Sequence, residues 1–324
     1  MKKRIRIKLA IRITFIPAKM HNIQSAIIRL NGIFVEHTNQ SNLNRFLRNI
    51  PVLEIFRKSI SLINHYSSDS LMVIDDMILE RNGRHSEGSG LVFDHTQDKS
   101  VRGMQYVTTV MSSNDGIFPL NLDLKARSSL SKIDMRMAVI KRSITAGHRF
   151  STVVFDSWYF ASRLVRFLER ENKGWVTEAK NNRKIFVGEE WMRLKDYAAS
   201  LNFRDMTACK VDENTYFMKS ITTRMKNIGR VQVRVSRGQN AEKFFVTNMI
   251  EWKPKQIMEM YLRRWDIEIM HRENKQDGLG RIYQRVFAGI VSTTKLSPLC
   301  EPLLEISPIR SLGYHLKIGK VHPV

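Results

Sequence analysis

The chain has 324 residues and a formal net charge of +22, because 53 Lys and Arg stand against 31 Asp and Glu. This excess of positive charge indicates a polyanionic partner, usually nucleic acid and less often an anionic membrane. Two cysteines, Cys209 and Cys300, exclude a disulfide framework and a four-cysteine zinc site, and no apolar run is long enough for a membrane-spanning helix.

The first 66 residues predict a basic segment followed by helices. Residues 1–19 alternate Ile and Leu with Arg and Lys, as a strand would, and these charges exclude the unbroken apolar core of a secretory signal. Apolar residues recur at three- and four-residue spacing in 21–34 and 41–66, which predicts helices. We interpret residues 1–66 as a basic arm and a helical N-terminal DNA-binding region, although a small helical bundle without that role also fits.

Residues 67–180 have a different pattern, in which short apolar runs alternate with helical periods. The apolar runs rich in β-branched residues predict strands, and a Ser at the start and Gly147 at the end bound the first helix. The predicted elements are strands 70–76, 90–96 and 103–113, helix 128–148, strand 151–155, helix 157–172 and strand 174–180. This order predicts an α/β fold with a mixed sheet.

Acidic residues close two of these strands. Asp75 follows the first apolar run and Asp156 follows the fourth. If the first and fourth strands are neighbours in the sheet, the two carboxylates lie side by side at one edge. Each also has a simpler interpretation, Asp75 or Asp76 as a turn residue and Asp156 with Ser157 as the cap of the next helix.

Residues 181–249 predict a β-rich insertion. A short helix is expected at 189–201, followed by antiparallel strands at 210–224, 228–238 and 242–250. The charged run KNNRK at 180–184 is either a solvated loop or a phosphate contact. Because it follows the strand 174–180, we expect Lys180 and Arg183 to contact DNA phosphates.

The stretch PKQIMEMYLRRWDIEIMHRENKQDGLG at 254–280 predicts one helix, with Pro254 in its first turn and glycines at its end. At 3.6 residues per turn, Tyr261, Arg264, Glu268 and Lys275 project within about 60° of one another. The flanking Trp265 and Met258 suggest that this charged face looks inward. The face is either an ordinary i, i+4 ion pair between Arg264 and Glu268 or part of a site.

Together, Asp75, Asp156 and Glu268 form a set of three carboxylates on two strand ends and a later helix. Oxygen ligands of this kind suit Mg²⁺ or Mn²⁺, and two such ions can activate an attacking hydroxyl and stabilise the leaving oxygen in phosphoryl transfer. The chain contains no HExxH, paired Cys/His or GxSxG motif that would indicate a zinc site or a serine nucleophile.

The spacing Tyr261-x2-Arg264-x3-Glu268-x6-Lys275 resembles the Tyr-Arg-Glu-Lys signature of DDE transposases of the insertion-sequence-four group. The segments IDD at 74–76, FDSWY at 155–159, RWDIE at 264–268 and KQDGLGRIYQRV at 275–286 are similar to the segments around that group's catalytic acids. The resemblance covers roughly residues 42–288.

This resemblance implies a ribonuclease H-like catalytic core in residues 67–180 and 250–290, interrupted by the β-rich insertion. It implies Asp75, Asp156 and Glu268 as catalytic ligands of two Mg²⁺ or Mn²⁺ ions, with Asp76 as the alternative to Asp75. It also implies that Tyr261, Arg264 and Lys275 contact the DNA backbone. The expected partners are terminal inverted repeats, target DNA and a second copy of the chain in a synaptic complex, with no membrane.

We therefore predict a cytoplasmic, nucleoid-associated prokaryotic transposase that cuts at inverted repeats and joins the 3′-OH ends to target DNA. Residues 291–324 lack a long helical period and contain Pro298, Pro302, Pro308 and Pro323. This atypical C-terminal tail would fit a truncated or frameshifted copy. The alternatives are a ribonuclease H-like nuclease of the junction resolvase type and a catalytically defunct DNA-binding remnant.

Overall fold

The computed structural model describes residues 45, 48–49, 70–81, 87–95, 97–114, 116–125, 130–211, 214–238 and 242–276. The chain divides into two compact units, one of residues 1–63, 78–105 and 270–324 and the other of residues 64–77 and 106–269. The predicted C-terminal tail lies outside the described residues. So does the predicted N-terminal region, apart from residues 45, 48 and 49, which are helical.

The first unit contains a short antiparallel pairing. Strand β2 (Gly90–Asp94) pairs with the first residues of β3 (Lys99–Ser113), with Gly90 opposite Gly103. A Cβ atom on Gly103 would lie 2.7 Å from the main-chain oxygen of Leu79, so only glycine allows this approach to β1 (Leu71–Glu80). β1, β3 and helix α9 (Trp265–Gln276) all continue into the second unit.

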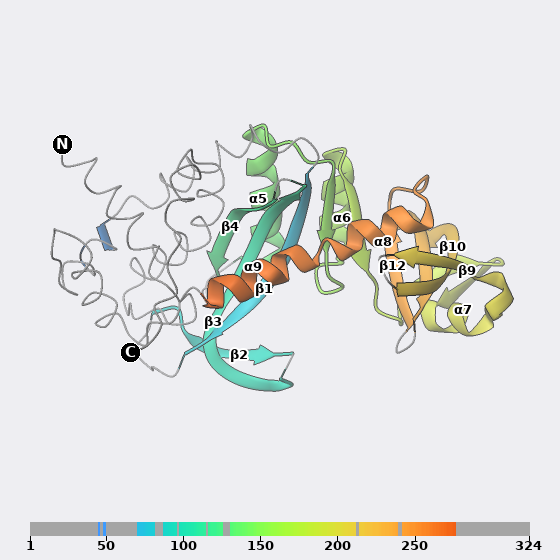
Figure 1. Cartoon of the computed structure of the whole chain (residues 1–324), viewed down its shortest axis with the longest axis horizontal. Coiled ribbons are helices and arrows are strands. Elements are labelled where there is room, and N and C mark those ends of the chain that lie inside the picture. The colour runs from blue at the N-terminus through green and yellow to red at the C-terminus, as the bar shows by residue number, and fades with distance from the viewer. Residues whose placement is uncertain are drawn as a thin grey trace, which may run out of the picture. The chain divides into compact units, whose positions relative to one another are not determined.

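The second unit is built on one large mixed sheet (Figure 1). The strand order is β4-β3-β1-β5-β6-β12-β11-β10-β7-β8, and β9 pairs with the free part of β10. β1, β5 and β6 are parallel, whereas β12 pairs with β6 in the antiparallel direction. The remaining bounds are β4 Gly116–Leu124, β5 Thr152–Phe155, β6 Gly174–Glu178, β7 Lys184–Val187, β8 Glu190–Arg193, β9 Thr207–Val211, β10 Asn214–Met225, β11 Gly229–Arg237 and β12 Glu242–Thr247.

Helices cover both faces of this sheet. Helix α8 (Pro254–Leu262) packs on one face against Leu71, Val154 and Val176. Helix α6 (Ser162–Arg170) packs on the opposite face, where Trp175 donates its ring N–H to Glu169 at 3.3 Å. Because successive side chains of a strand point to opposite faces, Val176 and Trp175 identify the two sides of the core. The fold is α/β, as predicted.

Two further helices have clear local causes. Helix α5 (Lys132–Thr145) starts at Ser131, whose hydroxyl accepts the main-chain N–H of Asp134 at 3.1 Å, and the chain leaves it through Gly147 at φ +76°. The stop at Gly147 is the one expected from the sequence, whereas the helix begins after Ser131 rather than at the predicted Ser128. Helix α7 (Leu194–Ser200) lies in the insertion directly after β8.

The structure corrects several predicted elements. Among the described residues, four strands rather than three precede α5, since residues 116–124 form β4 despite Pro119. The predicted helix 189–201 is β8 followed by α7, and the predicted strand 210–224 is largely β10, whose first residues form a hairpin with β9. The helix predicted at 157–172 begins at Ser162.

The stretch predicted as one helix at 254–280 is two helices. Pro254 does begin α8, but α8 ends at Leu262 and α9 begins at Trp265. The break falls at Arg263 and Arg264, in the middle of the predicted charged face. Of the two residues expected to mark an inward face, Met258 is buried as expected, whereas Trp265 is 51% exposed, so the expectation was wrong for Trp265. The predicted glycine end of the helix lies outside the described residues.

Candidate active site

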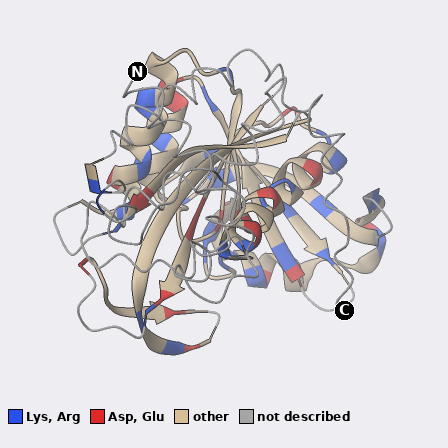
Figure 2. Ribbon diagram, turned by 60° about the vertical axis from the view of Figure 1, so that its left-hand side comes forward, with Lys and Arg blue, Asp and Glu red and all other residues tan. Residues whose placement is uncertain are grey.

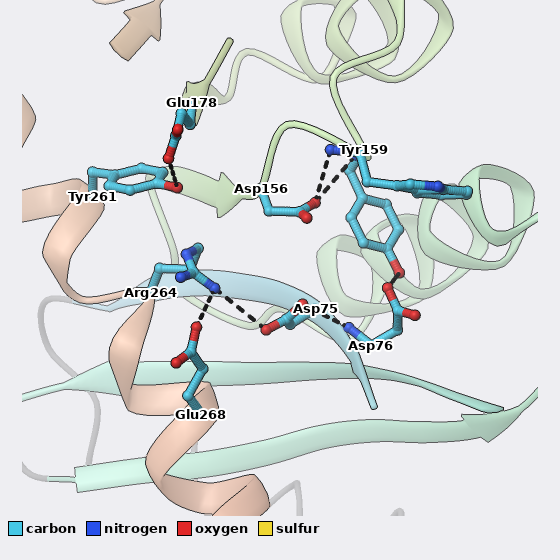
Figure 3. A network of polar contacts seen from close by, with 9 residues as sticks. Asp75, Asp76, Asp156, Tyr159, Glu178, Tyr261, Arg264 and Glu268 are labelled. Carbon is cyan, nitrogen blue, oxygen red and sulfur yellow. Dashed lines mark hydrogen bonds and ion pairs between the residues drawn. The ribbon is translucent and has the colours of Figure 1, made fainter. Parts of the chain in front are cut away.

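Three carboxylates form a row on the α8 face of the sheet (Figure 3). The strand register places Ile74 beside Phe155 and Phe155 beside Thr177 in the three parallel strands. The next residue of each segment is Asp75, Asp156 and Glu178. All three therefore lie on the same side as Val73, Val154 and Val176. The predicted proximity of Asp75 and Asp156 follows from this pairing, although β1 continues to Glu80 and Asp75 does not close it.

Asp156 supports the turn that follows β5. Its Oδ1 accepts the main-chain N–H of Trp158 at 3.1 Å and that of Tyr159 at 3.3 Å. Helix α6 starts later, with Ala161 as the residue before it, so Asp156 is not the helix cap considered from the sequence. Burial raises the pKa of Asp156, and the nearby charge of Asp76 acts in the same direction.

Asp75 and Asp76 have different surroundings because neighbouring side chains of a strand point to opposite faces. Asp75 accepts the N–H of Asp76 at 2.8 Å and the Nη1 of Arg264 at 3.4 Å. Asp76 instead binds the Nζ of Lys132 from α5 at 2.7 Å and the hydroxyl of Tyr159 at 3.4 Å. Burial raises the pKa of Asp75 to about 7, against the opposing effect of Arg264.

The break between α8 and α9 places Arg264 beside two acids. The N–H of Arg264 bonds to the oxygen of Tyr261 at 2.9 Å, and the N–H of Ile267 bonds to the oxygen of Arg264 at 3.3 Å, both three residues back. The guanidinium Nη1 lies 2.6 Å from Glu268 and 3.4 Å from Asp75. The predicted i, i+4 pair therefore forms, and it extends to the first strand of the carboxylate row.

Tyr261 is buried at the end of α8 and is bound to the third acid of the row. Its hydroxyl donates to Glu178 Oε2 at 3.1 Å, and its ring lies 4.7 Å from the ring of Phe245. The same Glu178 oxygen lies 3.6 Å from the Nζ of Lys243. Burial raises the pKa of the Tyr261 phenol, and the charge of Glu178 adds to the shift.

The other predicted DNA contacts do not join this network. Lys275 is exposed near the end of α9, in the first unit. Lys180 is exposed just after β6. Arg183 is half-buried, donates to the main-chain oxygen of Phe160 and stacks 4.7 Å from that ring. Burial lowers the pKa of Arg183.

Glu178 was missed by the sequence reasoning. It ends an apolar strand of the core, as Asp156 follows one, and the same pattern would have selected it. In the sequence Glu178 lies within the predicted strand 174–180, so its position beside Asp156 was not expected.

The donor set of the row fits a hard divalent cation. Asp75 and Asp156 are half-buried carboxylates on adjacent strands, and their partial burial disfavours the ionised form of each. A cation would relieve this cost, and oxygen-only ligands suit Mg²⁺ or Mn²⁺. Within the described residues, no three acids, histidines or cysteines converge as a preformed metal cage. Glu268 is instead bound to Arg264 and would have to exchange that partner to act as a ligand.

Comparison with sequence families gives one match. Residues 122–285, half of the chain, match the family described as "Archaeal putative transposase ISC1217". The match includes Asp156 and every residue of the Tyr-Arg-Glu-Lys spacing. No curated protein sequence matches.

Comparison with solved structures gives transposases. The piggyBac transposase, in a synaptic complex with hairpin DNA, matches 88% of this chain and 57% of its own, at a TM-score of 0.50 and 13% identity. The Drosophila P element transposase, in a strand transfer complex, matches 91% of this chain and 63% of its own, at a TM-score of 0.31 and 8% identity. The present chain thus spans less than two thirds of each. The piggyBac likeness agrees with the predicted ribonuclease H-like fold.

Proposed function

The chain belongs to the family described as archaeal transposase ISC1217, and from this premise we propose that it cuts DNA at the inverted repeats of its own element and joins the ends to target DNA. It is thus a DDE-type transposase. The Tyr-Arg-Glu-Lys spacing supports a place in the insertion-sequence-four group. Since its substrate is the host genome, we expect it to act in the prokaryotic cytoplasm, associated with the nucleoid.

The observation that carries this proposal is the position of Asp75 and Asp156. Two half-buried acids on adjacent parallel strands are costly to the fold unless they are paired or bind a cation. Arg264, at the α8–α9 junction, pairs with both Asp75 and Glu268 and so links the third acid to this pair. We therefore assign Asp75, Asp156 and Glu268 as ligands. Asp75 is preferred over Asp76 because Asp75 lies on the same face of the sheet as Asp156, whereas Asp76 lies on the opposite face, where it binds Lys132.

Two divalent ions bound there would supply activation of the attacking hydroxyl and stabilisation of the leaving oxygen. The chain's own residues orient the DNA. When Glu268 leaves Arg264, the freed guanidinium can bind a phosphate oxygen near the cleaved bond. Tyr261 and Lys275 are assigned to the same backbone. Hydrolysis of one phosphodiester frees a 3′-OH, which attacks a target phosphodiester directly, with no covalent enzyme intermediate.

The proposed assembly is a dimer on paired transposon ends, as synapsis requires two ends. End recognition is assigned to the N-terminal region, with Lys180 and Arg183 near the cut strand. Lys and Arg lie on many of the described helices and strands (Figure 2), and the sequence has 53 of them against 31 Asp and Glu, which favours sequence-independent binding to DNA. No helix among the described residues is long and apolar enough to cross a membrane.

Mg²⁺-dependent cleavage of duplexes carrying the flanking inverted repeats tests the proposal. Wild type is compared with Asp156→Ala, Glu268→Ala and, as a matched acidic control, Asp205→Ala in the insertion. We expect cleavage and strand transfer by the wild type and the control, and neither by the other two. Activity that survives Asp156→Ala would refute the assignment of the site.

The same assay separates the competing functions. Cleavage of branched DNA without preference for the inverted repeats would favour a junction resolvase. Binding without metal-dependent cleavage in the wild type would favour a defunct remnant. Strand transfer products with the element's 3′ ends joined to target DNA would exclude both.

A further inference from the structure

Helix α6 presents a basic face to solvent. Its buried side consists of Leu164, Val165, Phe167 and Leu168, which pack on the sheet. The exposed side forms a hollow lined by Ser162, Arg163, Arg166, Glu169 and Arg170. Arg163 is paired with Asp134 at 2.6 Å, and Glu169 accepts the ring N–H of Trp175. Arg166 and Arg170 have no acidic partner among the described residues.

A second basic hollow lies between the loop after β6 and the turn that joins β10 to β11. It is lined by Lys180, Asn182, Arg183, Lys184, Lys226 and Asn227. The N–H of Lys226 bonds to the oxygen of Lys184 at 3.0 Å, so main-chain hydrogen bonding holds the two lysines near each other. Asn227 adopts φ +67° and Gly229 adopts φ +127°, which closes the turn tightly.

One hydrogen bond joins the two hollows. Arg166 of α6 donates from Nη2 to the main-chain oxygen of Asn227 at 3.4 Å. The lining of both hollows holds seven Lys and Arg against one Glu. They therefore form a single surface, which we name the α6 surface, made of the residues that line the two hollows.

We propose that the α6 surface binds the phosphate backbone of duplex DNA, as a second contact separate from the residues that surround the carboxylate row. This inference rests on the proposed function and adds a binding surface to it. Only Lys180 and Arg183 were expected from the sequence to contact DNA. The structure adds the α6 arginines, Lys184 at the start of β7 and Lys226 in the β10–β11 turn.

The position of the surface favours DNA. It begins next to the site, since α6 follows the Asp156 turn and Lys180 follows Glu178 by two residues. From Arg163 to Arg170 the helix advances about 10 Å, which corresponds to about three base pairs of duplex. Arginine binds phosphate oxygens with two parallel N–H groups, and the lysines add point charges.

Salt-dependent binding tests the proposal. A fluorescently labelled duplex of random sequence is titrated in EDTA with wild type and with the variant Arg166→Ala, Arg170→Ala, Lys184→Ala, Lys226→Ala. Each lost phosphate contact lowers the slope of log Kd against log salt by about 0.9, so we expect the slope of the quadruple variant to fall by about 3 to 4. We also expect it to bind the duplex roughly 100-fold more weakly at about 0.1 M salt.

A control variant removes the same number of charges elsewhere. Lys195→Ala, Arg204→Ala, Lys210→Ala, Lys255→Ala changes exposed residues outside the α6 surface. We expect its slope to fall by less than about 1. An equal fall in both variants, or an unchanged slope in the first, would overturn the proposal.

The readout is independent of catalysis. All four altered side chains are exposed, so the fold should survive, and the double variant Arg166→Lys, Arg170→Lys should keep the wild-type slope. If the quadruple variant unfolds, Arg166→Ala with Lys226→Ala should show half the effect. A wild type that fails to cleave inverted repeats would refute the proposed function and leave this inference standing. Normal cleavage by the wild type, together with an unaltered slope in the quadruple variant, would refute this inference and leave the proposed function standing.

Discussion

In the second unit, the acids of the candidate site and the bases of the α6 surface differ in their exposure to solvent. Asp75 and Asp156 are half-buried, on adjacent strands whose pairing fixes their positions, and burial raises the pKa of both. The Arg and Lys side chains of the α6 surface are mainly exposed, on a helix face and two loops. The acids therefore cost the fold stability, whereas the bases cost it little.

This difference indicates how each group can be tested. A substitution in the carboxylate row should alter stability and activity together, and in opposite directions. A substitution on the α6 surface should alter affinity for DNA with little effect on stability. The predictions below proceed from the largest expected effect to the smallest.

Asp75→Asn should abolish activity and stabilise the free protein. Cleavage should fall by at least about 10²- to 10³-fold, as for loss of a group that acts on transition-state charge. The folded state raises the pKa of Asp75 from 3.8 to about 7, so the stability that this group contributes is full below pH 3.8 and is lost as the pH rises to 7. Because Asn does not ionise, the variant does not lose this stability as the pH rises.

Urea unfolding in metal-free buffer checks the second half of that prediction. We expect the variant to gain about 2 kcal/mol over wild type at about pH 8 and much less at about pH 5. Lys184→Ala, on the α6 surface, is the matched control and should leave the unfolding free energy unchanged. A variant that loses stability at both pH values would contradict the account of the buried row.

Arg264→Ala should destabilise the fold by about 2–3 kcal/mol, because it leaves Asp75 and Glu268 without their common partner. Glu268→Ala should cost less, since Arg264 retains Asp75. A double-mutant cycle measures the coupling, expected to be at least about 0.5 kcal/mol. Purely additive effects would mean that the Arg264–Glu268 ion pair contributes nothing to the free energy of unfolding.

His271, on α9 in the first unit, provides a buried base for comparison. Burial lowers its pKa from 6.5 to about 3, and the charge of Lys275 contributes. Its contribution to stability is full above pH 6.5 and is lost as the pH falls toward 3. Wild type should lose about 2 kcal/mol from this group between about pH 7 and about pH 4. His271→Phe should remove that part of the pH dependence in urea unfolding.

Tyr261→Phe should have the smallest effect on stability, about 0.5–1 kcal/mol, through the lost hydrogen bond to Glu178. Glu178→Gln keeps an acceptor oxygen and should lose less. If the hydroxyl also serves the DNA backbone, Tyr261→Phe raises the KM for DNA more than Glu178→Gln does. Equal KM values for the two variants would limit the hydroxyl to a role in the fold.

The positions of Asp75 and Asp156 could be predicted from the sequence, because they depend on the pattern of nearby residues. An apolar run that ends in an acid marks a buried strand, and two such strands in an α/β order suggest neighbours in the sheet. The register that places Asp75 beside Asp156 then follows from hydrogen bonding between β1 and β5. The capped helix α5 was predictable for the same local reasons.

The rest depended on tertiary packing. Pro119 argues against a strand, yet β4 forms and pairs with β3, with a register shift at Thr109 and Val110. The break at Arg263 and Arg264 has no Pro or Gly to mark it. There, Arg263 donates to the Ser112 hydroxyl at 2.7 Å and Arg264 pairs with Asp75. Both partners lie on strands of the sheet, so tertiary contacts coincide with the end of α8.

The antiparallel pairing of β6 with β12 has a consequence for the length of the chain. The insertion leaves the core through β6 and returns through β12, with Phe245 opposite Glu178. This hydrogen-bonded pair fixes the exit and the return whatever lies between them. Strand β10 is not free to change, because its Met218 packs in the same cluster as Ile257 and Tyr261 of α8. We therefore expect added residues to be tolerated best at the turn between β7 and β8, which lies at the far end of the strand order from β6.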